Sequence, residues 1–339
     1  MSAMENDEPR GANDDGWYQD PPRRAPVAGR GPLAYHAGAM TVHVFAHEAC
    51  LGHEMTPGHP ERPARLTAIR EELADPGVAA GLVWHQAPEA SRAELERVHP
   101  AFYVDHIRDL SAAGGGVLDP DTSTNSRSWA AALRAAGAGV RAVAAALDGE
   151  GNAFLAVRPP GHHALASHAM GFCLFNNVVV AARAALARDD VERVLIVDWD
   201  VHHGNGTQAL VERDPAIRFV SLHQWPLYPG TGRAGERGVG NVWNVPRPPG
   251  LAPGSYVRDL LAAVGEATRG WRPQLILISA GFDAMRGDPL AGFTLEAGHY
   301  LELSQRLREF GVPLVAMLEG GYDLANLRAG VRTTVEAFG

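Results

Sequence analysis

The sequence contains no lysine, and all 30 of its basic residues are arginine. This absence excludes an enzyme that forms a Schiff base through lysine, and it excludes a phosphate-binding loop built on the P-loop lysine. Only two cysteines are present, Cys50 and Cys173, and neither belongs to a zinc-type cysteine pair. Two cysteines so far apart indicate no disulfide framework, which fits a reducing compartment, and we expect a cytoplasmic protein.

Long apolar runs are also missing. No run approaches the roughly 18 residues needed to cross a bilayer, and the N-terminus lacks the charged and then apolar pattern of a secretion signal. The net charge of −9 does not suit a surface that binds nucleic acid. The sequence therefore predicts neither a membrane nor a nucleic acid as a partner.

Residues 1–38 are rich in Asp, Asn, Gly, Pro and Arg and show no apolar period, which predicts a flexible N-terminal tail. From residue 39 onward, aliphatic strand-like runs alternate with helical patterns. This alternation is typical of an α/β protein with a parallel sheet. By length alone, the 339 residues could form one large α/β domain or two domains.

The most informative stretch is Val194–Gly206, in which four aliphatic residues run into two carboxylates and two imidazoles. An unbroken apolar run predicts a strand buried on both faces, with its polar end at the carboxyl edge of the sheet. Side chains alternate along an extended strand, so we expect Asp198, Asp200 and His202 to point to one side. Two carboxylates and an imidazole form most of a metal site, because charges buried side by side are costly unless they are paired or bind metal.

Three further strand-like runs end in residues that carry chemistry. The run from Pro273 ends in Asp283, a candidate third ligand of an Asp-His-Asp zinc site. The run from Asn152 ends in a histidine pair, His162 and His163, and imidazoles suit general acid and base work near neutral pH. The run from Val312 ends in two glycines and Tyr322, whose phenol could donate a hydrogen bond to a developing oxyanion.

Four motifs together resemble the histone deacetylase and acetylpolyamine amidohydrolase superfamily, and the resemblance runs from about residue 41 to the end. They are Arg-Pro-Pro-Gly-His-His at 158–163, Asp-Trp-Asp-Val-His-His-Gly-Asn-Gly at 198–206, Ser-Ala-Gly-Phe-Asp at 279–283 and Glu-Gly-Gly-Tyr-Asp at 319–323. The resemblance implies the three-layer α/β/α arginase-deacetylase fold, with a central parallel sheet, in a single catalytic domain over residues 39–339. Within the superfamily, the sequence is most similar to class II-like members of the bacterial type.

The resemblance also implies a metal-dependent mechanism. Asp200, His202 and Asp283 would bind one catalytic Zn²⁺, for which Fe²⁺ or another divalent ion can substitute in some members. His163 would be the general base, and Tyr322 would polarise the acyl carbonyl. His162 would act as an electrostatic partner or help to protonate the leaving amine.

Supporting residues follow from the same resemblance. A structural potassium ion would be held by the side chains of Asp198, Asp200 and Ser221 and by the backbone carbonyls of His202 and Leu222. Asp198 would also orient His162. Asn205 would be the partner of His163, at a position where many class I members carry aspartate and class II-like members asparagine.

The substrate is indicated by residues of the acyl-lysine tunnel. Gly171 and Phe172 would form one wall and Tyr228 the other, while Leu290 stands where the polyamine-selective class IIb enzyme carries a glutamate. The leading interpretation is a zinc-dependent deacetylase acting on N-acyl-lysine. A second interpretation is an acetylpolyamine or other small-amide hydrolase, in which Glu48 or Glu54 would bind the amine. A third interpretation is a catalytically weak protein that binds acyl-lysine. The sequence is also compatible with a homo-oligomer.

Overall fold

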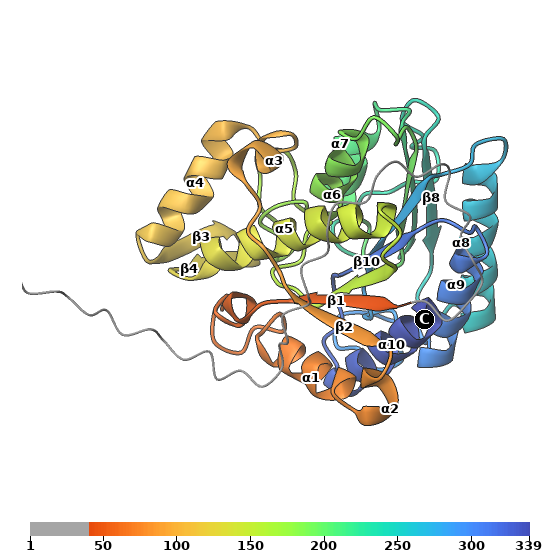
Figure 1. The fold of residues 1–339 in the computed structure, drawn as a ribbon, viewed down its shortest axis with the longest axis horizontal. Coiled ribbons are helices and arrows are strands. Elements are labelled where there is room, and N and C mark those ends of the chain that lie inside the picture. Colours follow the sequence, from red (N-terminus) through yellow and green to blue (C-terminus); the bar gives the residue numbers. More distant parts are fainter. Residues whose placement is uncertain (1–40) are drawn as a thin grey trace, which may run out of the picture.

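The computed structural model describes residues 41–339 and is built around one sheet of eight parallel strands (Figure 1). Their order across the sheet is β2-β1-β5-β10-β9-β6-β7-β8. The strands are β1 Val42–Ala46, β2 Leu82–Gln86, β5 Asn152–Leu155, β6 Val194–Asp198, β7 Ile217–Gln224, β8 Val242–Arg247, β9 Leu275–Ala280 and β10 Leu314–Leu318. The predicted central parallel sheet is confirmed. The tail predicted for residues 1–38 lies outside the described residues.

The middle of the sheet is its most apolar part. Every residue of β6, β9 and β10 is buried, and these strands consist almost wholly of aliphatic side chains. A strand covered on both faces has no solvent side, so its sequence is a continuous apolar run and does not alternate. This explains why the central strands were the easiest to predict.

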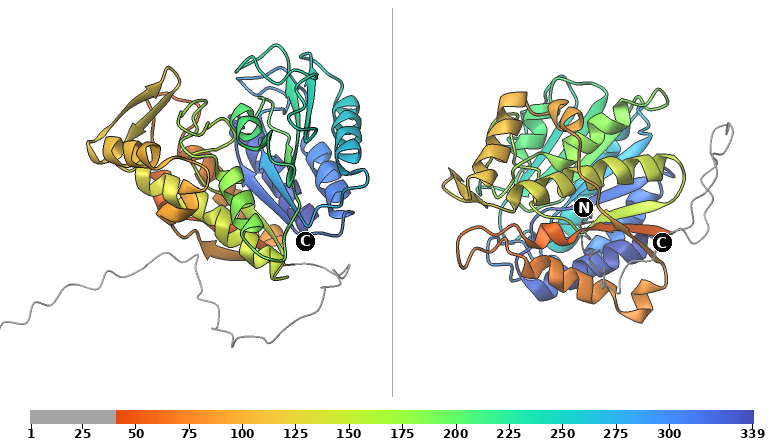
Figure 2. Two further views of the ribbon diagram at one scale, coloured as in Figure 1. Left: turned by 90° about the horizontal axis from the view of Figure 1, so that it is seen from above. Right: turned by 60° about the vertical axis from the view of Figure 1, so that its left-hand side comes forward.

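Helices cover both faces of the sheet (Figure 2). The helices are α1 Ala64–Leu73, α2 Pro76–Ala79, α3 Arg92–Glu96, α4 Ala101–Ala112, α5 Ser128–Leu147, α6 Asn177–Leu186, α7 Asn205–Val211, α8 Pro253–Thr268, α9 Ala297–Arg308 and α10 Leu324–Phe338, with a short 3₁₀ helix at Glu48–Leu51. One layer contains α5, α6 and α7, and the other contains α1, α8, α9 and α10. The predicted three-layer α/β/α arrangement is confirmed.

Helix α5 is long and apolar enough to cross a membrane if only its length and composition are considered. In the structure it packs on β5, β10 and α6, and 67% of its most apolar window is buried. Alanine has the highest helix propensity, and its small side chain lets a helix lie close to its neighbours. These contacts are those of a core helix.

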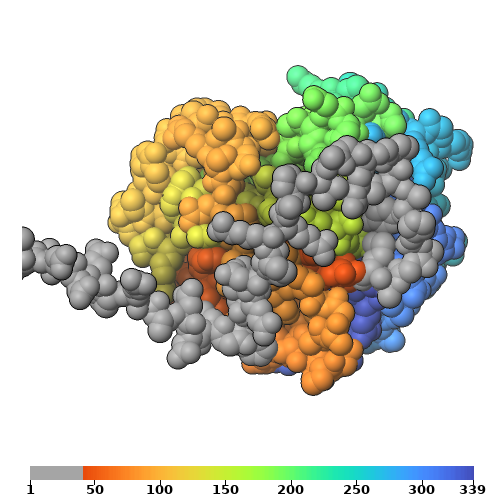
Figure 3. Space-filling view, viewed as in Figure 1, coloured from red at the N-terminus to blue at the C-terminus, as the bar shows by residue number. Residues whose placement is uncertain are grey.

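A small lobe extends beyond the sheet and consists of α3, α4 and a hairpin of β3 Gly115–Asp119 and β4 Thr122–Asn125. Its own apolar cluster contains Tyr103, Ile107 and Phe175. Figure 3 shows the lobe at the upper left and α1 at the lower edge, beside the C-terminal segment. The hairpin was not predicted, because the glycines at 114–116 indicate only a helix break, yet it reaches the candidate site.

Candidate active site

The candidate catalytic side chains lie at the carboxyl edge of four neighbouring strands. Strands β5, β10, β9 and β6 are adjacent and parallel, so their carboxyl ends meet at one edge. The histidine pair follows β5, Tyr322 follows β10, Asp283 follows β9, and Asp198 is the last residue of β6. The structure thus brings together the four strand ends that the sequence singled out.

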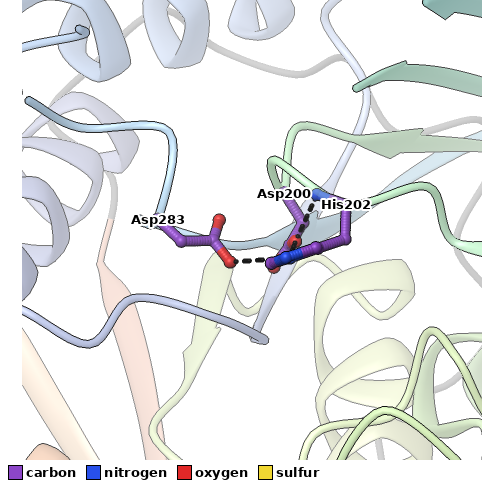
Figure 4. A group of neighbouring side chains, drawn as sticks. All are labelled: Asp200, His202 and Asp283. Atoms are coloured by element: carbon purple, nitrogen blue, oxygen red, sulfur yellow. Dashed lines mark hydrogen bonds and ion pairs between the residues drawn. The ribbon is translucent and has the colours of Figure 1, made fainter. Parts of the chain in front are cut away.

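Asp200, His202 and Asp283 point toward one another in the loops after β6 and β9 (Figure 4). His202 Nδ1 lies 3.1 Å from Asp200 Oδ1 and 3.3 Å from Asp283 Oδ2. All three residues are buried, and their ligand atoms lie within 4.8 Å of one another. Among residues 41–339, no other group of three such side chains is arranged to hold a metal ion.

The arrangement of these atoms fits a divalent ion. Tetrahedral zinc with bonds of about 2.0 Å places its ligand atoms about 3.3 Å apart, close to the separations of His202 Nδ1 from the two carboxylate oxygens. Asp283 Oδ2 is buried and has no hydrogen-bond partner in the described part of the chain, although His202 lies near it. Buried carboxylate oxygens normally accept hydrogen bonds or bind cations, so this atom is suited to be a metal ligand.

Two glycines make room for this cluster. A Cβ atom at Gly320 would lie 2.0 Å from Asp283 Oδ2, and one at Gly281 would lie 2.1 Å from Asp200 Oδ2. The Gly320 N–H donates to Asp200 Oδ2 at 2.8 Å. Only glycine lets the backbone come this close to the carboxylates. The hydrogen bond from Gly320 fixes Oδ2 of Asp200, and Oδ1 of Asp200 faces His202.

The electrostatics of the cluster favour a positive charge at its centre. Burial raises the pKa of Asp283 to about 7, and the Asp200 carboxylate contributes to that rise. Burial alone would lower the pKa of His202, but the two nearby carboxylates of Asp200 and Asp283 raise it to about 10. A protonated imidazole or a divalent ion can supply the charge that lets both carboxylates ionise.

His162 and His163 lie side by side in the loop after β5, with ring centroids 4.0 Å apart. His162 Nδ1 lies 3.0 Å from Asp198 Oδ2, and His163 Nδ1 lies 2.7 Å from Asn205 Oδ1. The Asn205 amide nitrogen points instead to Met170 Sδ, at 3.4 Å. With the amide oxygen facing His163, Nδ1 donates its proton and Nε2 keeps a free lone pair.

The two imidazoles differ in charge. Burial lowers the pKa of His163 well below its ordinary value, and the positive charge of His162 lowers it further. Burial acts on His162 in the same direction, but the Asp198 and Asp200 carboxylates outweigh it and raise the pKa of His162 to about 10. A neutral imidazole able to accept a proton therefore lies beside a protonated one.

Glu319 holds the backbone of the histidine pair, although no role for this residue was predicted. Its Oε2 accepts hydrogen bonds from the N–H groups of Gly161 at 2.7 Å and His162 at 3.1 Å. Its Oε1 lies 3.2 Å from Ser279 Oγ. The sequence did contain a signal for this role. Glu319 directly follows a fully buried strand, and a buried carboxylate needs hydrogen-bond donors around it.

Aromatic rings border these groups. The rings of Phe172 and Tyr322 meet edge to face at 5.9 Å, and those of His163 and Tyr228 do so at 5.1 Å. His59, in the loop before α1, packs edge-on against Phe172 at 4.5 Å. The predicted walls therefore stand next to the predicted catalytic residues.

Phe172 has a left-handed backbone, with φ of 71°, which is rare for a residue with a side chain. The unpredicted hairpin holds it there. Thr122 Oγ1 accepts from the Phe172 N–H at 2.9 Å, and Asp121 Oδ1 accepts from the Gly171 N–H at 3.1 Å. Gly171 itself leaves no room for a Cβ, which would lie 2.3 Å from His163 Cδ2. Strained backbone of this kind persists only when its surroundings fix it.

Of the residues predicted to bind potassium, Asp198, Ser221 and Leu222 lie on neighbouring strands, whereas Asp200 and His202 lie in the loop after β6. Asp198 and Ser221 are paired in the register of β6 and β7, and Leu222 follows on β7. Asp198 Oδ1 accepts from the Asp200 N–H at 3.1 Å, and Ser221 Oγ lies 3.0 Å from His223 Nδ1. Potassium binding here stays a prediction.

The residues expected to contact the substrate lie in different surroundings. Leu290 lies half-buried in the loop between β9 and α9. Glu48 forms an ion pair with Arg70 of α1, so its charge is already balanced, and Glu54 is exposed. A role for either glutamate in binding an amine stays a prediction.

Comparison with known proteins identifies the same family. The sequence profile described as the histone deacetylase domain matches residues 59–338. The histone deacetylase-like amidohydrolase of Pseudomonas aeruginosa is 42% identical over 279 residues, covering 79% of this chain and 73% of that protein. The human polyamine deacetylase HDAC10 is 36% identical over 296 residues, covering 81% of this chain and 44% of that protein. The solved HD domain of HDA15 superposes with a TM-score of 0.85 at 38% identity, covering 89% of this chain and 88% of that domain.

Proposed function

This chain belongs to the histone deacetylase family, with the arginase-deacetylase fold and the amidohydrolase activity of that family, and we propose that it removes acetyl or similar acyl groups from N-acyl-lysine side chains. One observation carries the mechanism. His163, kept neutral by burial and with its lone pair on Nε2, lies next to the cluster of Asp200, His202 and Asp283, and its ring centroid is 5.9 Å from that of His202.

Asp200, His202 and Asp283 would hold one divalent ion, zinc in the first instance and Fe²⁺ as an alternative. Such an ion, when bound, polarises the amide carbonyl and lowers the pKa of a water molecule. The paired Asp198 and Ser221 would hold a structural potassium ion nearby.

The side chains of this protein would then move the protons. His163 Nε2 accepts a proton from the attacking water as its oxygen bonds to the carbonyl carbon, and Asn205 holds the required tautomer. A neutral amide partner stabilises the resulting imidazolium less than a carboxylate would. The C–N bond then breaks, the amine nitrogen takes up a proton, and the acid is released.

Charge at the carbonyl oxygen would be balanced by Tyr322 and His162. The Tyr322 phenol donates a hydrogen bond to the oxygen as its negative charge grows. Burial, together with the charges of Asp283 and Asp200, raises the pKa of this phenol well above its ordinary value, so it keeps its proton. His162, held by Asp198, supplies positive charge or protonates the leaving amine.

A lysine substrate fits the lining of the site. The aromatic walls at Phe172 and Tyr228 suit the methylene chain of acyl-lysine, and Leu290 is uncharged. The similarity to a human polyamine deacetylase favours a second candidate, hydrolysis of acetylpolyamines. A free ammonium group would then need a carboxylate, and Glu48 is already paired with Arg70.

The two substrates can be separated by measuring kcat/KM of the zinc-loaded protein on an acetyl-lysine peptide and on acetylputrescine. We expect at least about a tenfold preference for the peptide, because an unpaired ammonium near a neutral side chain loses roughly 1.4 kcal/mol or more of binding free energy. Leu290→Glu is the matched variant, and it should shift the preference toward acetylputrescine. A wild-type preference for acetylputrescine would contradict the acyl-lysine assignment, and turnover of neither substrate would contradict the proposed hydrolysis.

A further inference from the structure

We propose that Asp288 is a positioning residue that fixes Tyr322 and Leu290 relative to each other through their backbone N–H groups. Neither the sequence motifs nor the mechanism above uses this side chain. The inference rests on the proposed role of Tyr322 as the donor to the carbonyl oxygen, and it names what holds that donor in place.

Asp288 contacts the two segments with different oxygens. It is 5% exposed. Its Oδ1 accepts from the Leu290 N–H at 3.0 Å, and its Oδ2 accepts from the N–H groups of Tyr322 at 2.8 Å and Asp323 at 3.4 Å. One carboxylate therefore joins the loop after β9 to the loop after β10.

The loop that carries Tyr322 needs such support. Two glycines, Gly320 and Gly321, precede the tyrosine, and Gly321 has φ of +117°, which few other residues adopt. Glycine adds backbone freedom, and a phenol must stay within a fraction of an ångström of its productive position to help in catalysis. Contacts from outside the loop must therefore restrict it.

The carbonyl side of the same loop is bound by a buried cation. Arg65 of α1 donates from Nε to the Gly321 carbonyl at 2.7 Å and from Nη2 to the Glu319 carbonyl at 2.5 Å. Its guanidinium lies 5.0 Å from the centroid of the Tyr322 ring, and its Nη1 lies 3.1 Å from Glu61, a carboxylate that also pairs with Arg158. The loop is thus bound through its carbonyls by Arg65 and through its amides by Asp288.

An asparagine could not replace this aspartate. A carboxylate accepts hydrogen bonds on both oxygens, whereas an amide accepts on one side and donates on the other. A buried carboxylate is costly without a cation, and among residues 41–339 no ion pair involves Asp288. The backbone N–H groups that donate to both oxygens offset part of that cost. The carboxylate is therefore suited to bind the two loops at once.

The test compares Asp288→Asn with Asp323→Asn in the zinc-loaded protein. Both changes replace a carboxylate by an amide next to Tyr322. Asp323 caps α10 with one oxygen, which accepts from the Asn326 N–H at 2.9 Å, and asparagine caps equally well. We expect Asp288→Asn to lower kcat about tenfold or more, with KM and zinc content changed less than about twofold, because a displaced donor weakens the transition state. Asp323→Asn should stay within about twofold of wild type.

A double-mutant cycle separates positioning from general damage to the fold. If Asp288 acts through Tyr322, then Asp288→Asn should cost less than about twofold in kcat when Tyr322→Phe is already present. Multiplicative losses would overturn the inference. Equal kcat values for Asp288→Asn and Asp323→Asn would overturn it as well.

Backbone amide exchange gives a readout that needs neither metal nor turnover. Peptides that cover residues 320–323, or those that cover Leu290, should exchange faster in Asp288→Asn than in wild type or Asp323→Asn, because the amide keeps an acceptor for only one of the two N–H groups. Unchanged exchange in both segments would show that Asp288 does not hold them. A wild-type protein that hydrolyses neither amide would instead refute the proposed function and with it the catalytic part of this inference, and the exchange rates would still decide the structural part.

Discussion

His163→Ala is expected to lower kcat about a thousandfold while the protein still binds zinc and folds normally. The reason lies in the surroundings of the imidazole. Its Nδ1 is fixed by Asn205, its burial keeps it neutral, and its Nε2 is the only free basic atom of the histidine pair. Without it, the attacking water has no base to take its proton.

The measurement is single-substrate kinetics on an acetyl-lysine peptide, with zinc content and thermal unfolding recorded on the same samples. His106→Ala is the control, because His106 is exposed on α4, in the small lobe beyond the sheet. Retention of more than about a tenth of wild-type kcat by His163→Ala would assign the base to another group, since general bases contribute at least a hundredfold.

Tyr322→Phe should lower kcat about a hundredfold or more with little change in zinc affinity. The change removes one hydroxyl and leaves the ring, so the contacts with Phe172 and Arg65 persist. Burial, together with the charges of Asp283 and Asp200, raises the pKa of the phenol, so it keeps its proton. A donor of this kind acts mainly when charge develops on the carbonyl oxygen. The loss should therefore fall on kcat more than on KM.

Tyr300→Phe is the matched control for this substitution. The Tyr300 hydroxyl is buried without a hydrogen-bond partner in the described part of the chain, and its ring packs on Trp199 and Phe282. Its removal should leave both stability and kcat near wild type. Equal activity of Tyr322→Phe and wild type would remove Tyr322 from the mechanism.

The strand ends were predictable from sequence because buried parallel strands leave a clear signal. The aliphatic runs before Asp198, Asp283 and Tyr322 each form a central strand, and the sheet then places their ends together. The alternation expected to align Asp198, Asp200 and His202 was wrong in detail. Strand β6 ends at Asp198, so the next two side chains reach the cluster from a loop.

What could not be predicted depends on backbone groups meeting across the fold. Glu319 binds the amides of Gly161 and His162, and Asp288 binds that of Tyr322, but no local pattern records which amides a carboxylate will reach. The hairpin that holds Phe172 was missed for the same reason. Its glycines and short polar strands resemble a loop until it contacts the pocket wall.

The most direct test of the central claim is to remove the metal and titrate zinc back while following hydrolysis of an acetyl-lysine peptide. We predict that the chelated protein is inactive and that activity returns in proportion to bound zinc, reaching its maximum at one ion per chain, with no recovery in Asp283→Asn. Full activity after chelation, or recovery in Asp283→Asn equal to that of wild type, would contradict a metal-dependent site at Asp200, His202 and Asp283.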